Sequence, residues 1–402
     1  MIEEGKTPEG YKGTEIAIIP EDWDVQSLGT NSILKARIGW QGLTTAEYLT
    51  DGEYYLITGT EFINGRIDWD NCYYVKKQRY QQDRNIQVRK NDILVTKDGT
   101  IGKVAFIDQV MGRATLNSGI FAIRPLKSAY EPEYLYHILM SRVFRDFLDR
   151  LAAGSTISHL YQKDFVHFEF PIPSITEQKA ISEVLTDTDN LILLLEKLIN
   201  KKKKIKQGAM QHLLTGKKRL PGFSGDWEND KVKNIASVST GSKNTQDNNP
   251  NGKYPFFVRS SIVERIDTYS FDGEAVLTAG DGVGTGKVFH YINGKFDIHQ
   301  RVYKISDFCS RVHGYYFYLY FSFNFLDRIM AMTAKSSVDS VRMEMIADME
   351  ILLPKIQEQK AIAQVLSDMD AEIEGLEEKL EKYKTIKQGM MQELLTGRIR
   401  LI

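Results

Sequence analysis

An internal duplication constrains the possible folds of this chain more than any other feature of its sequence. Residues 173–189 read PSITEQKAISEVLTDTD, and residues 354–370 read PKIQEQKAIAQVLSDMD. Residues 205–220 and 386–401 match in the same way, as IKQGAMQHLLTGKKRL and IKQGMMQELLTGRIRL. Both matches fall at a single offset of 181 residues, and agreement of this length does not arise by chance. The chain therefore contains two equivalent long segments, each of which follows a domain of its own.

Each repeated segment is predicted to form one long helix, because seam residues recur at steps of three and four. In the first copy these residues are Ile181, Val184, Leu185, Thr188, Leu191, Leu195, Leu198 and Ile205. In the second copy they are Ile362, Val365, Met369, Ile373, Leu376, Leu380, Tyr383, Ile386 and Met390. About 38 helical residues at roughly 1.5 Å each give a rod of roughly 57 Å. Because one duplicated unit presents the same seam twice, we expect the helices to pair rather than pack separately on their own domains.

The segments before the two helices also resemble each other, more faintly. The first contains NDILVTKDGTIGKVAFI (91–107) and ATLNSGIFAIRP (114–125), and the second contains GEAVLTAGDGVGTGKVFHY (273–291) and FDIHQRVYKI (296–305). Each is a β-branched run, a glycine-rich turn ending in Gly-Lys-Val and a further strand. We therefore expect an α+β protein with two mixed α/β domains. The expected division is an N-terminal segment 1–20, a first domain 21–172, a first long helix 173–216, a second domain 217–353 and a second long helix 354–402.

Composition excludes several classes of protein. No stretch approaches 18 uninterrupted apolar residues, and the polar N-terminus lacks the apolar core of a signal peptide. Cys72 and Cys309 are the only cysteines, which excludes a disulfide framework and a Cys-based zinc site. These features predict a cytoplasmic protein. The net charge of −1 argues weakly against nucleic-acid binding, although an acidic surface elsewhere can offset a basic face.

The motifs of the common enzyme classes are absent from the sequence. The segment GDGVGTGKV (280–288) lacks the spacing and the Ser or Thr that a phosphate-binding P-loop requires. The seven histidines are scattered, and no nucleophile elbow or amino-methyltransferase tetrad is present. We therefore expect no catalytic residue, metal or cofactor in this chain. The lysine run 201–204 fits a contact with DNA or with an acidic partner, and a solvated helix face is the favoured alternative.

The duplicated Pro…Glu-Gln-Lys-Ala-Ile and Ile-Lys-Gln-Gly-x-Met-Gln-x-Leu-Leu-Thr-Gly motifs, with the Tyr11–Trp23 segment, resemble those of the specificity subunits of type I restriction–modification systems. The resemblance covers the whole chain. It implies two target-recognition domains joined by two long antiparallel coiled-coil helices, related by a pseudo-twofold internal repeat. Each domain would read one half of a bipartite, asymmetric double-stranded DNA target. Two modification subunits would methylate adenine with S-adenosylmethionine, and restriction subunits would supply cleavage that depends on ATP and Mg.

Polar residues on the two equivalent turns and on the strands after them are the candidates for DNA contact. Arg, Lys, Asn, Gln, Ser and Thr read base edges, while phosphate contacts set the register of the protein on the duplex. In the first domain the candidates are Lys97, Thr100, Lys103, Arg113, Asn117 and Ser118, with Ser155 and Thr156 as secondary candidates. In the second they are Arg259, Lys287, His299, Gln300 and Arg301, with Ser336 and Ser337 as secondary candidates. Ordinary loop solvation is an equal alternative for each residue.

Two other functions remain open from the sequence. One is the specificity partner of a restriction system in which a fused nuclease–methyltransferase supplies catalysis. The other is a coiled-coil adaptor whose two domains bind proteins or glycans. Two similar domains on one rigid spacer suit two DNA sites about one helical turn, or roughly 34 Å, apart. Such a pair should bind DNA with a steep dependence on salt, whereas an adaptor should not.

Overall fold

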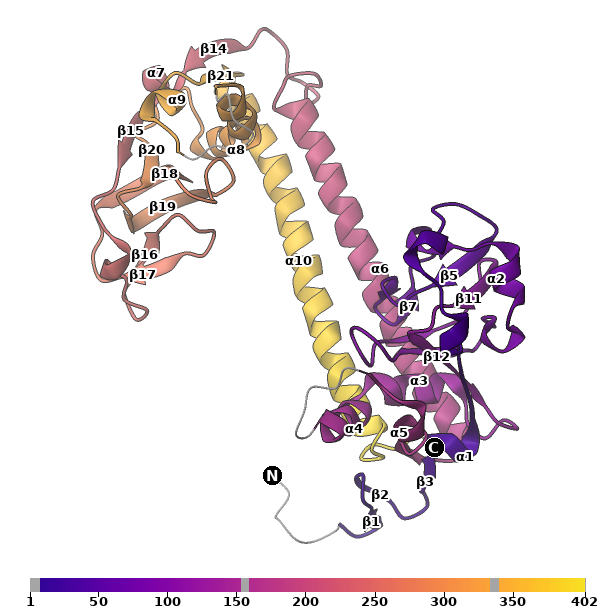
Figure 1. The fold of residues 1–402 in the computed structure, drawn as a ribbon. Coiled ribbons are helices and arrows are strands. Elements are labelled where there is room, and N and C mark those ends of the chain that lie inside the picture. The colour runs from indigo at the N-terminus through magenta and orange to yellow at the C-terminus, as the bar shows by residue number, and fades with distance from the viewer. Residues whose placement is uncertain (1–7, 153–158, 333–339, 402) are drawn as a thin grey trace. The chain divides into compact units, whose positions relative to one another are not determined.

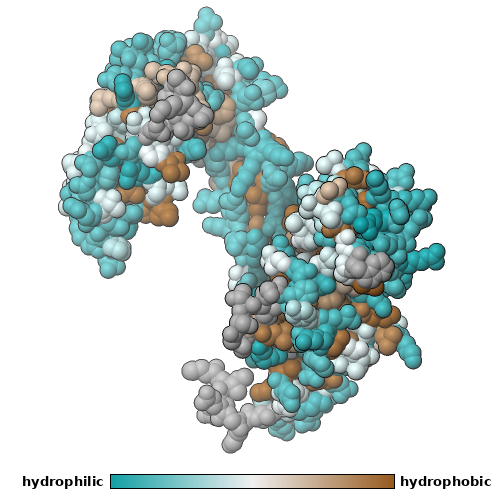
Figure 2. All heavy atoms as spheres, viewed as in Figure 1, coloured by the Kyte–Doolittle hydropathy of each residue, from teal (hydrophilic) through white to brown (hydrophobic). Residues whose placement is uncertain are grey.

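A computed structural model describes residues 8–152, 159–332 and 340–401 of the chain (Figure 1). The chain divides into two compact units, which are Met1–Leu195 with Lys379–Ile402 (unit 1) and Glu196–Glu378 (unit 2). Each unit combines a mixed α/β domain with one end of both long helices. Most of the surface in view is hydrophilic (Figure 2). Within the described ranges no helix is long and apolar enough to span a membrane.

The domain of unit 1 contains a four-stranded sheet in the order β10-β9-β12-β4 and a three-stranded sheet in the order β11-β5-β8. The strands of the first sheet are β4 (Ser32–Ala36), β9 (Ile93–Thr96), β10 (Val104–Phe106) and β12 (Ile120–Pro125). Those of the second are β5 (Tyr54–Ile57), β8 (Tyr73–Tyr74) and β11 (Arg113–Leu116), and β5 runs parallel to β11. Three strand pairs complete the domain: β1 (Tyr11–Gly13) with β2 (Ile18–Pro20), β3 (Asp24–Ser27) with β13 (Glu169–Ile172), and β6 (Phe62–Ile63) with β7 (Arg66–Ile67).

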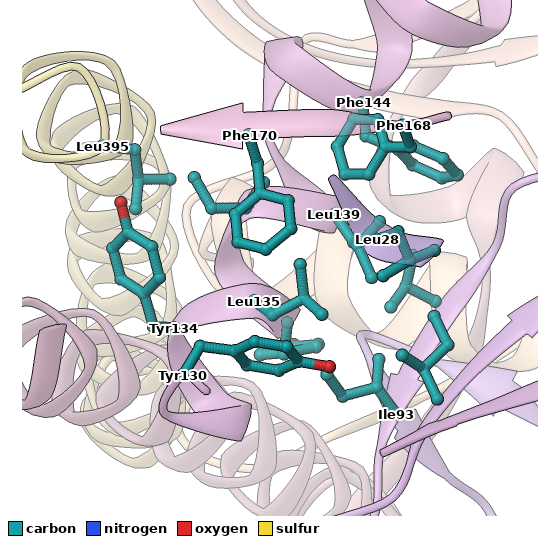
Figure 3. Close-up of a cluster of buried hydrophobic side chains, with 14 of the residues drawn as sticks. Leu28, Ile93, Tyr130, Tyr134, Leu135, Leu139, Phe144, Phe168, Phe170 and Leu395 are labelled. Carbon is teal, nitrogen blue, oxygen red and sulfur yellow. The ribbon is translucent and has the colours of Figure 1, made fainter. Parts of the chain in front are cut away.

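The helices of this domain are α1 (Leu28–Asn31), α2 (Lys77–Gln81), α3 (Pro132–Met140), α4 (Arg142–Ala152) and α5 (Gln162–Phe165). All of them except α2 contribute to its aromatic core. Figure 3 shows Tyr134, Phe144 and Phe168 in this core, together with Leu395 from the segment after the second long helix. The phenol of Tyr134 is fully buried and donates to the carbonyl of Pro171 at 2.9 Å, so its polar atom is satisfied. The C-terminal end of the chain is therefore part of the core of unit 1.

Unit 2 contains a six-stranded sheet in the order β15-β20-β18-β19-β16-β17. Its strands are β15 (Ser237–Thr240), β16 (Tyr254–Phe257), β17 (Glu264–Ile266), β18 (Phe271–Ala279), β19 (Phe289–Ile298) and β20 (Val302–Ser306). A separate pair joins β14 (Glu228–Lys231) to β21 (Glu350–Leu353), and the helices are α7 (Val232–Ile235), α8 (Gly314–Met332) and α9 (Met343–Ala347). The aromatic face of α8 buries Phe317, Phe321 and Phe325 against residues of the sheet such as Val276 and Ile305.

The two repeated segments form α6 (Ile175–Leu213) and α10 (Ile356–Leu394), each 39 residues long. The helices are antiparallel. In unit 1 the first turns of α6 pack against the last turn of α10, through Ile181 and Leu394. In unit 2 the last turn of α6 packs against the first turns of α10, through Leu213 and Ile362. The expected α+β architecture, with two mixed domains, antiparallel long helices and an internal repeat, is confirmed.

Part of the predicted apolar seam is wrong. Val184, Leu198, Ile205 and Ile386 were expected in the seam, yet each is more than a third exposed. Ile199, which was not assigned to the seam, is buried next to Leu195. An α-helix has 3.6 residues per turn, so a seam traced at steps of three and four drifts around a long helix. Only the position of the partner helix decides which of two neighbouring apolar residues is covered.

The lysine run at 201–204 is split between two environments in unit 2. Lys202 and Lys203 pair with Glu372 and Glu377 of α10, each at 2.6 Å. Lys201 and Lys204 lie on exposed helix surface. Half of the run therefore joins the two helices, and the other half fits the solvated face favoured from the sequence.

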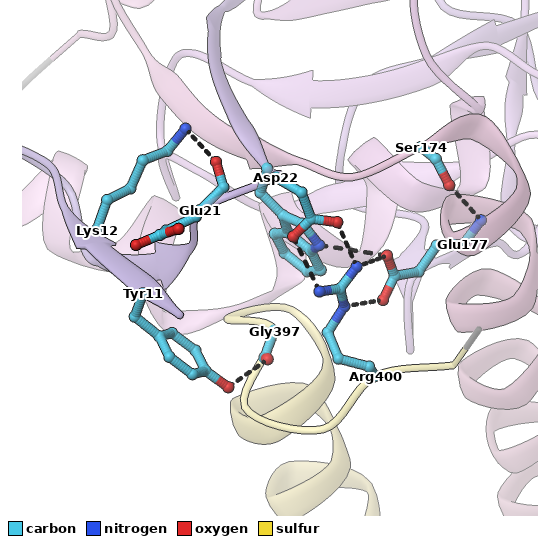
Figure 4. A network of polar contacts seen from close by, with 9 residues as sticks. Tyr11, Lys12, Glu21, Asp22, Ser174, Glu177, Gly397 and Arg400 are labelled. Atoms are coloured by element: carbon cyan, nitrogen blue, oxygen red, sulfur yellow. Dashed lines mark hydrogen bonds and ion pairs between the residues drawn. The ribbon is translucent and has the colours of Figure 1, made fainter. Parts of the chain in front are cut away.

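In each unit an arginine that follows one long helix binds a glutamate in the first turn of the other long helix. Figure 4 shows this contact in unit 1. In unit 1 the guanidinium of Arg400 donates to Glu177 at 2.6 and 2.8 Å and to Asp22 at 2.8 and 3.0 Å. In unit 2, Arg219 donates twice to Glu358 at 2.5 Å. Each guanidinium also lies over an indole ring, Trp23 at 5.7 Å and Trp227 at 5.4 Å. The duplication thus extends to a repeated polar contact.

Candidate nucleic-acid interface

In unit 1 the glycine-rich turn joins β9 to β10 and is held by the hydroxyl of Thr96. This hydroxyl donates to the carbonyl of Thr100 at 2.6 Å and accepts the amide of Lys103 at 2.9 Å. Gly99 has a φ of 68°, in the left-handed region that glycine adopts at low cost. A Cβ on Gly102 would lie 2.4 Å from the side chain of Leu148 in α4. The turn is therefore fixed at its base and exposes its tip.

In unit 2 the corresponding turn joins β18 to β19. The hydroxyl of Thr285 donates to the carbonyl of Gly282 at 2.7 Å, and Gly282 has a φ of 77°. A Cβ on Gly286 would lie 2.5 Å from Ile329 in α8. Gly286 therefore packs against α8 as closely as Gly102 packs against α4. Asp281 forms an isolated β-bridge with Ser340, and Asp98 forms one with His159. The two turns are therefore equivalent in structure as well as in sequence, although the second has one more residue between its Asp-Gly pair and its Gly-Lys pair.

Two of the candidates in unit 2, Arg259 and Arg301, meet at Asp281, and His299 and Gln300 directly precede Arg301 in the chain. The Asp281 carboxylate accepts Nη1 of Arg259 at 2.9 Å and lies 3.3 Å from Nη1 of Arg301. His299 precedes Arg301 by two residues, and its Nδ1 accepts the Arg301 amide at 3.0 Å. Nε2 of Gln300 donates to Oδ1 of Asn244 at 2.5 Å. Lys287 is exposed at the end of the same turn.

This cluster carries excess positive charge on an exposed surface. Arg259 and Arg301 have about half or more of their side chains exposed, and Asp281 neutralises only one of the two charges. Burial, followed by the nearby Arg259, lowers the pKa of His299. The ring is therefore neutral at neutral pH, which suits the acceptor role of Nδ1. Such a cluster can place two guanidinium groups against phosphates or base edges.

The candidates in unit 1 form two groups rather than one. The amide of Lys97 donates to the carbonyl of Gly119 at 2.8 Å, so the turn lies against the segment that holds Asn117 and Ser118. Arg113 begins β11, about 13 Å along the strand from Asn117. Its Nη1 donates to the hydroxyl of Tyr54 at 3.1 Å. Arg113 is therefore separated from the turn, at the opposite end of the strand.

The side-chain amide of Asn117 is largely occupied by the protein itself. Nδ2 donates to the hydroxyl of Tyr48 at 2.9 Å, and Oδ1 accepts the amide of Ser118 at 2.7 Å. Each of these two atoms can form a second hydrogen bond. The two contacts therefore fix the orientation of the Asn117 amide without excluding a contact with a base edge.

Several residues of this surface were not among the candidates. Asp98 binds His159, and Asp281 binds Arg259. Asn244 accepts a hydrogen bond from Gln300, and Tyr48 accepts one from Asn117. The Asp-Gly pair that both turns share is a sequence signal that could have pointed to the two aspartates. Ser155, Thr156, Ser336 and Ser337 lie outside the described residues. Over the described part of the chain, no group of three His, Cys, Asp or Glu side chains is arranged to hold a metal.

Comparison with known proteins identifies the architecture. The family model described as type I restriction modification DNA specificity domain matches residues 20–207 and 224–384. The chain is 26% identical to the type I restriction enzyme MjaVIII specificity subunit of Methanocaldococcus jannaschii, over 98% of this chain and 96% of that protein. It is also 26% identical to the putative MjaX specificity subunit of the same organism, over 98% and 97% of the two chains. In fold it is similar to the crystal structure of a type I S subunit from M. genitalium, with a TM-score of 0.66, 15% identity and coverage of 92% and 96%.

Proposed function

This chain belongs to the DNA specificity subunits of type I restriction–modification systems, and from that premise we propose that it reads a bipartite, asymmetric DNA target, one half with each unit. The duplicated turn is the observation that carries the proposal. Each unit presents an Asp-Gly turn with an exposed tip that packs against a helix and ends in an exposed lysine. The side chains around the two tips differ, as two unlike half-sites require.

Direct readout and phosphate contact are divided among the candidates by their surroundings. Arg259 and Arg301 are exposed, paired and oriented, which suits two-hydrogen-bond contacts with guanine or phosphate. Lys103 and Lys287 end their turns on exposed surface, which suits phosphate contacts that set the register. His299 is almost fully buried, and it shapes the backbone of Arg301.

The partners that we propose are two modification subunits and the restriction subunits. The exposed apolar residues Ile205 and Ile386 support docking on the helices, because they occupy equivalent positions of the repeat. Gly208 and Gly389, three residues further on, each have open space where a Cβ would lie. Glycine within a helix costs roughly 1 kcal/mol relative to alanine. A close approach by a partner would account for keeping glycine at both positions.

Catalysis is assigned to the partners in this proposal. Adenine methylation with S-adenosylmethionine and cleavage driven by ATP and Mg would reside in the modification and restriction subunits. This chain would supply the sequence specificity alone. Its own contribution would be the choice of target and the distance between the two half-sites.

The test combines the purified chain with the modification subunit encoded beside its gene. Transfer of labelled methyl groups from S-adenosylmethionine to DNA should require both proteins, and methylome sequencing of cells with and without the gene should reveal one two-part target. The chain should also bind target DNA with an affinity that falls steeply with salt. Methyl transfer by the chain alone would contradict the assignment of catalysis. Salt-independent or absent DNA binding would instead favour an adaptor.

A further inference from the structure

The tip of the turn in unit 2 carries an apolar side chain that the fold does not use. Val283 is 95% exposed, the highest value among the exposed large hydrophobic residues of the described chain. Glycines flank it on both sides, at positions 282 and 284. An isolated exposed valine needs no explanation on an ordinary surface. The surroundings of this one are not ordinary.

The turn that carries Val283 is held in place by the protein and begins at the charged Asp281. Thr285, which is almost fully buried, ties the turn to the carbonyl of Gly282. A Cβ on Gly284 would lie 2.4 Å from the carbonyl oxygen of Arg259, so the turn is packed against the neighbouring loop. Val283 follows Asp281 by two residues, and Asp281 holds Arg259 and Arg301. An exposed apolar group therefore lies in the same turn as the aspartate that holds two arginines suited to the DNA backbone.

The equivalent residue in unit 1 is Thr100. Each residue follows the positive-φ glycine of its Asp-Gly pair, Gly99 or Gly282. Both side chains are exposed at the tip of a turn. Valine and threonine have nearly the same shape, but threonine has a hydroxyl where valine has a methyl. The two units therefore present the same tip with opposite chemistry, one polar and one apolar.

We propose that Val283 recognises the 5-methyl group of a thymine in the half-site read by unit 2, while Thr100 makes a polar contact at the matching place in the other half-site. This inference rests on the proposed DNA-binding function. Thymine is the base that presents a methyl group in the major groove, and apolar side chains contact it there. A contact between valine and a phosphate or a polar base edge would be unfavourable, because valine would bury that polar group without giving it a hydrogen-bond partner.

The experiment uses the full chain assembled with its modification subunit and duplexes that carry the target found by methylome sequencing. The half-site of unit 2 is the one whose preference changes in the Arg301→Gln variant. In that half-site, each thymine is replaced in turn by deoxyuridine, which lacks only the 5-methyl group. At one position the wild-type complex should lose about fourfold in affinity, as expected for one methyl group removed from an apolar contact. The Val283→Ser variant should bind the two duplexes equally.

Thr100→Val is the matched control, because it makes the same kind of change at the tip in unit 1. It should leave the preference for thymine over deoxyuridine in the second half-site unchanged. The proposal is overturned if that half-site contains no A·T pair, if deoxyuridine has no effect at any position, or if Val283→Ser keeps the preference. If Val283 were inserted between base pairs instead, deoxyuridine would have no effect at any position, because stacking does not need the methyl group of thymine. Failure of the DNA-binding function is separate, since the complex would then not distinguish the target from a random duplex.

Discussion

Arg400, beyond the end of the second long helix, forms a two-pronged ion pair with Glu177 in the first turn of the first long helix, 223 residues earlier. The carboxylate of Glu177 is 2% exposed and also accepts Nε1 of Trp23 at 3.2 Å. Arg219 and Glu358 repeat this relationship in unit 2. In each unit, one contact therefore ties together segments that are far apart in the chain.

We expect Arg400→Ala to destabilise unit 1. The substitution leaves the buried carboxylate of Glu177 without its partner, and breaking such a pair costs about 3 kcal/mol. Urea denaturation, followed by a probe in unit 1, measures the change. Arg398→Ala is the control, because Arg398 is exposed and its pair with Glu393 at 3.6 Å is at the surface. Equal stability of the two variants would show that the Arg400 contact is not structural.

Lowering the pH should destabilise unit 1 because of His137. The ring is fully buried, and its Nε2 lies 3.1 Å from the hydroxyl of Thr186. Burial, with smaller effects of Lys387 and Arg66, lowers the pKa of His137 from 6.5 to about 3. Between these values the unfolded chain binds a proton that the folded chain does not. The free energy of unfolding should therefore decrease as pH falls below 6.5, by up to about 1.4 kcal/mol per pH unit.

Unfolding of the His137→Asn variant at pH 7 and pH 5 tests this expectation. The variant should be less stable at pH 7 but should lose less stability between the two pH values than the wild type. His212 is exposed near the end of α6, so His212→Asn should keep the wild-type slope. The same slope in all three proteins would mean that other groups control the acid sensitivity.

Asp281 should increase the specificity of DNA binding by restraining two arginines. The Asp281→Asn substitution removes the charge that holds Arg259 and Arg301, so both guanidinium groups become freer to contact phosphates. Affinity for random-sequence DNA should rise, and the ratio of target to random affinity should fall, by about 1–3 kcal/mol in discrimination. Binding to the two duplexes across a salt series measures both quantities.

Asp272→Asn is the control for this variant. Asp272 is exposed on β18 and lies 4.0 Å from Lys295. Its replacement by asparagine therefore removes the same charge from the same domain. If both variants change the two affinities alike, the effect is one of net charge and Asp281 has no particular role. A change of preference in the half-site of unit 1 would contradict the division of the target between the units.

The long helices should set the distance between half-sites. α6 passes from unit 1 to unit 2 after Leu195, and α10 returns after Glu378. Inserting seven residues after Leu195 and seven after Leu376 keeps the seam in phase and adds roughly 10 Å. The preferred spacer should grow by about three base pairs, and affinity should fall because the second half-site also rotates.

Methylation of a library with every spacer length tests this expectation. A three-residue insertion at the same points is the matched control, because it puts the seam out of phase and should destabilise the protein. A stably folded seven-residue variant that keeps the original spacer would show that the helices do not set the distance.

The sequence by itself determined the architecture of this protein. The exact offset between the repeats and the steps of the apolar residues predicted two equivalent helices, and α6 and α10 each run for 39 residues. The glycine-rich turns were also evident, because Asp98-Gly99 and Asp281-Gly282 carry their own conformational signal. These features are local or repeated, so neighbouring residues suffice to reveal them.

Only the tertiary structure decided which side chains act together. Arg259, Asp281 and Arg301 meet because β16, β18 and β20 lie in one sheet, and nothing in their spacing predicts the pairing. The amide of Asn117 is occupied by Tyr48, which is 69 residues away in the chain. The partner helix likewise decided that Ile199 is buried and Ile205 exposed. Burial and hydrogen bonding depend on atoms that folding brings together from distant parts of the chain, and a linear pattern does not contain those distances.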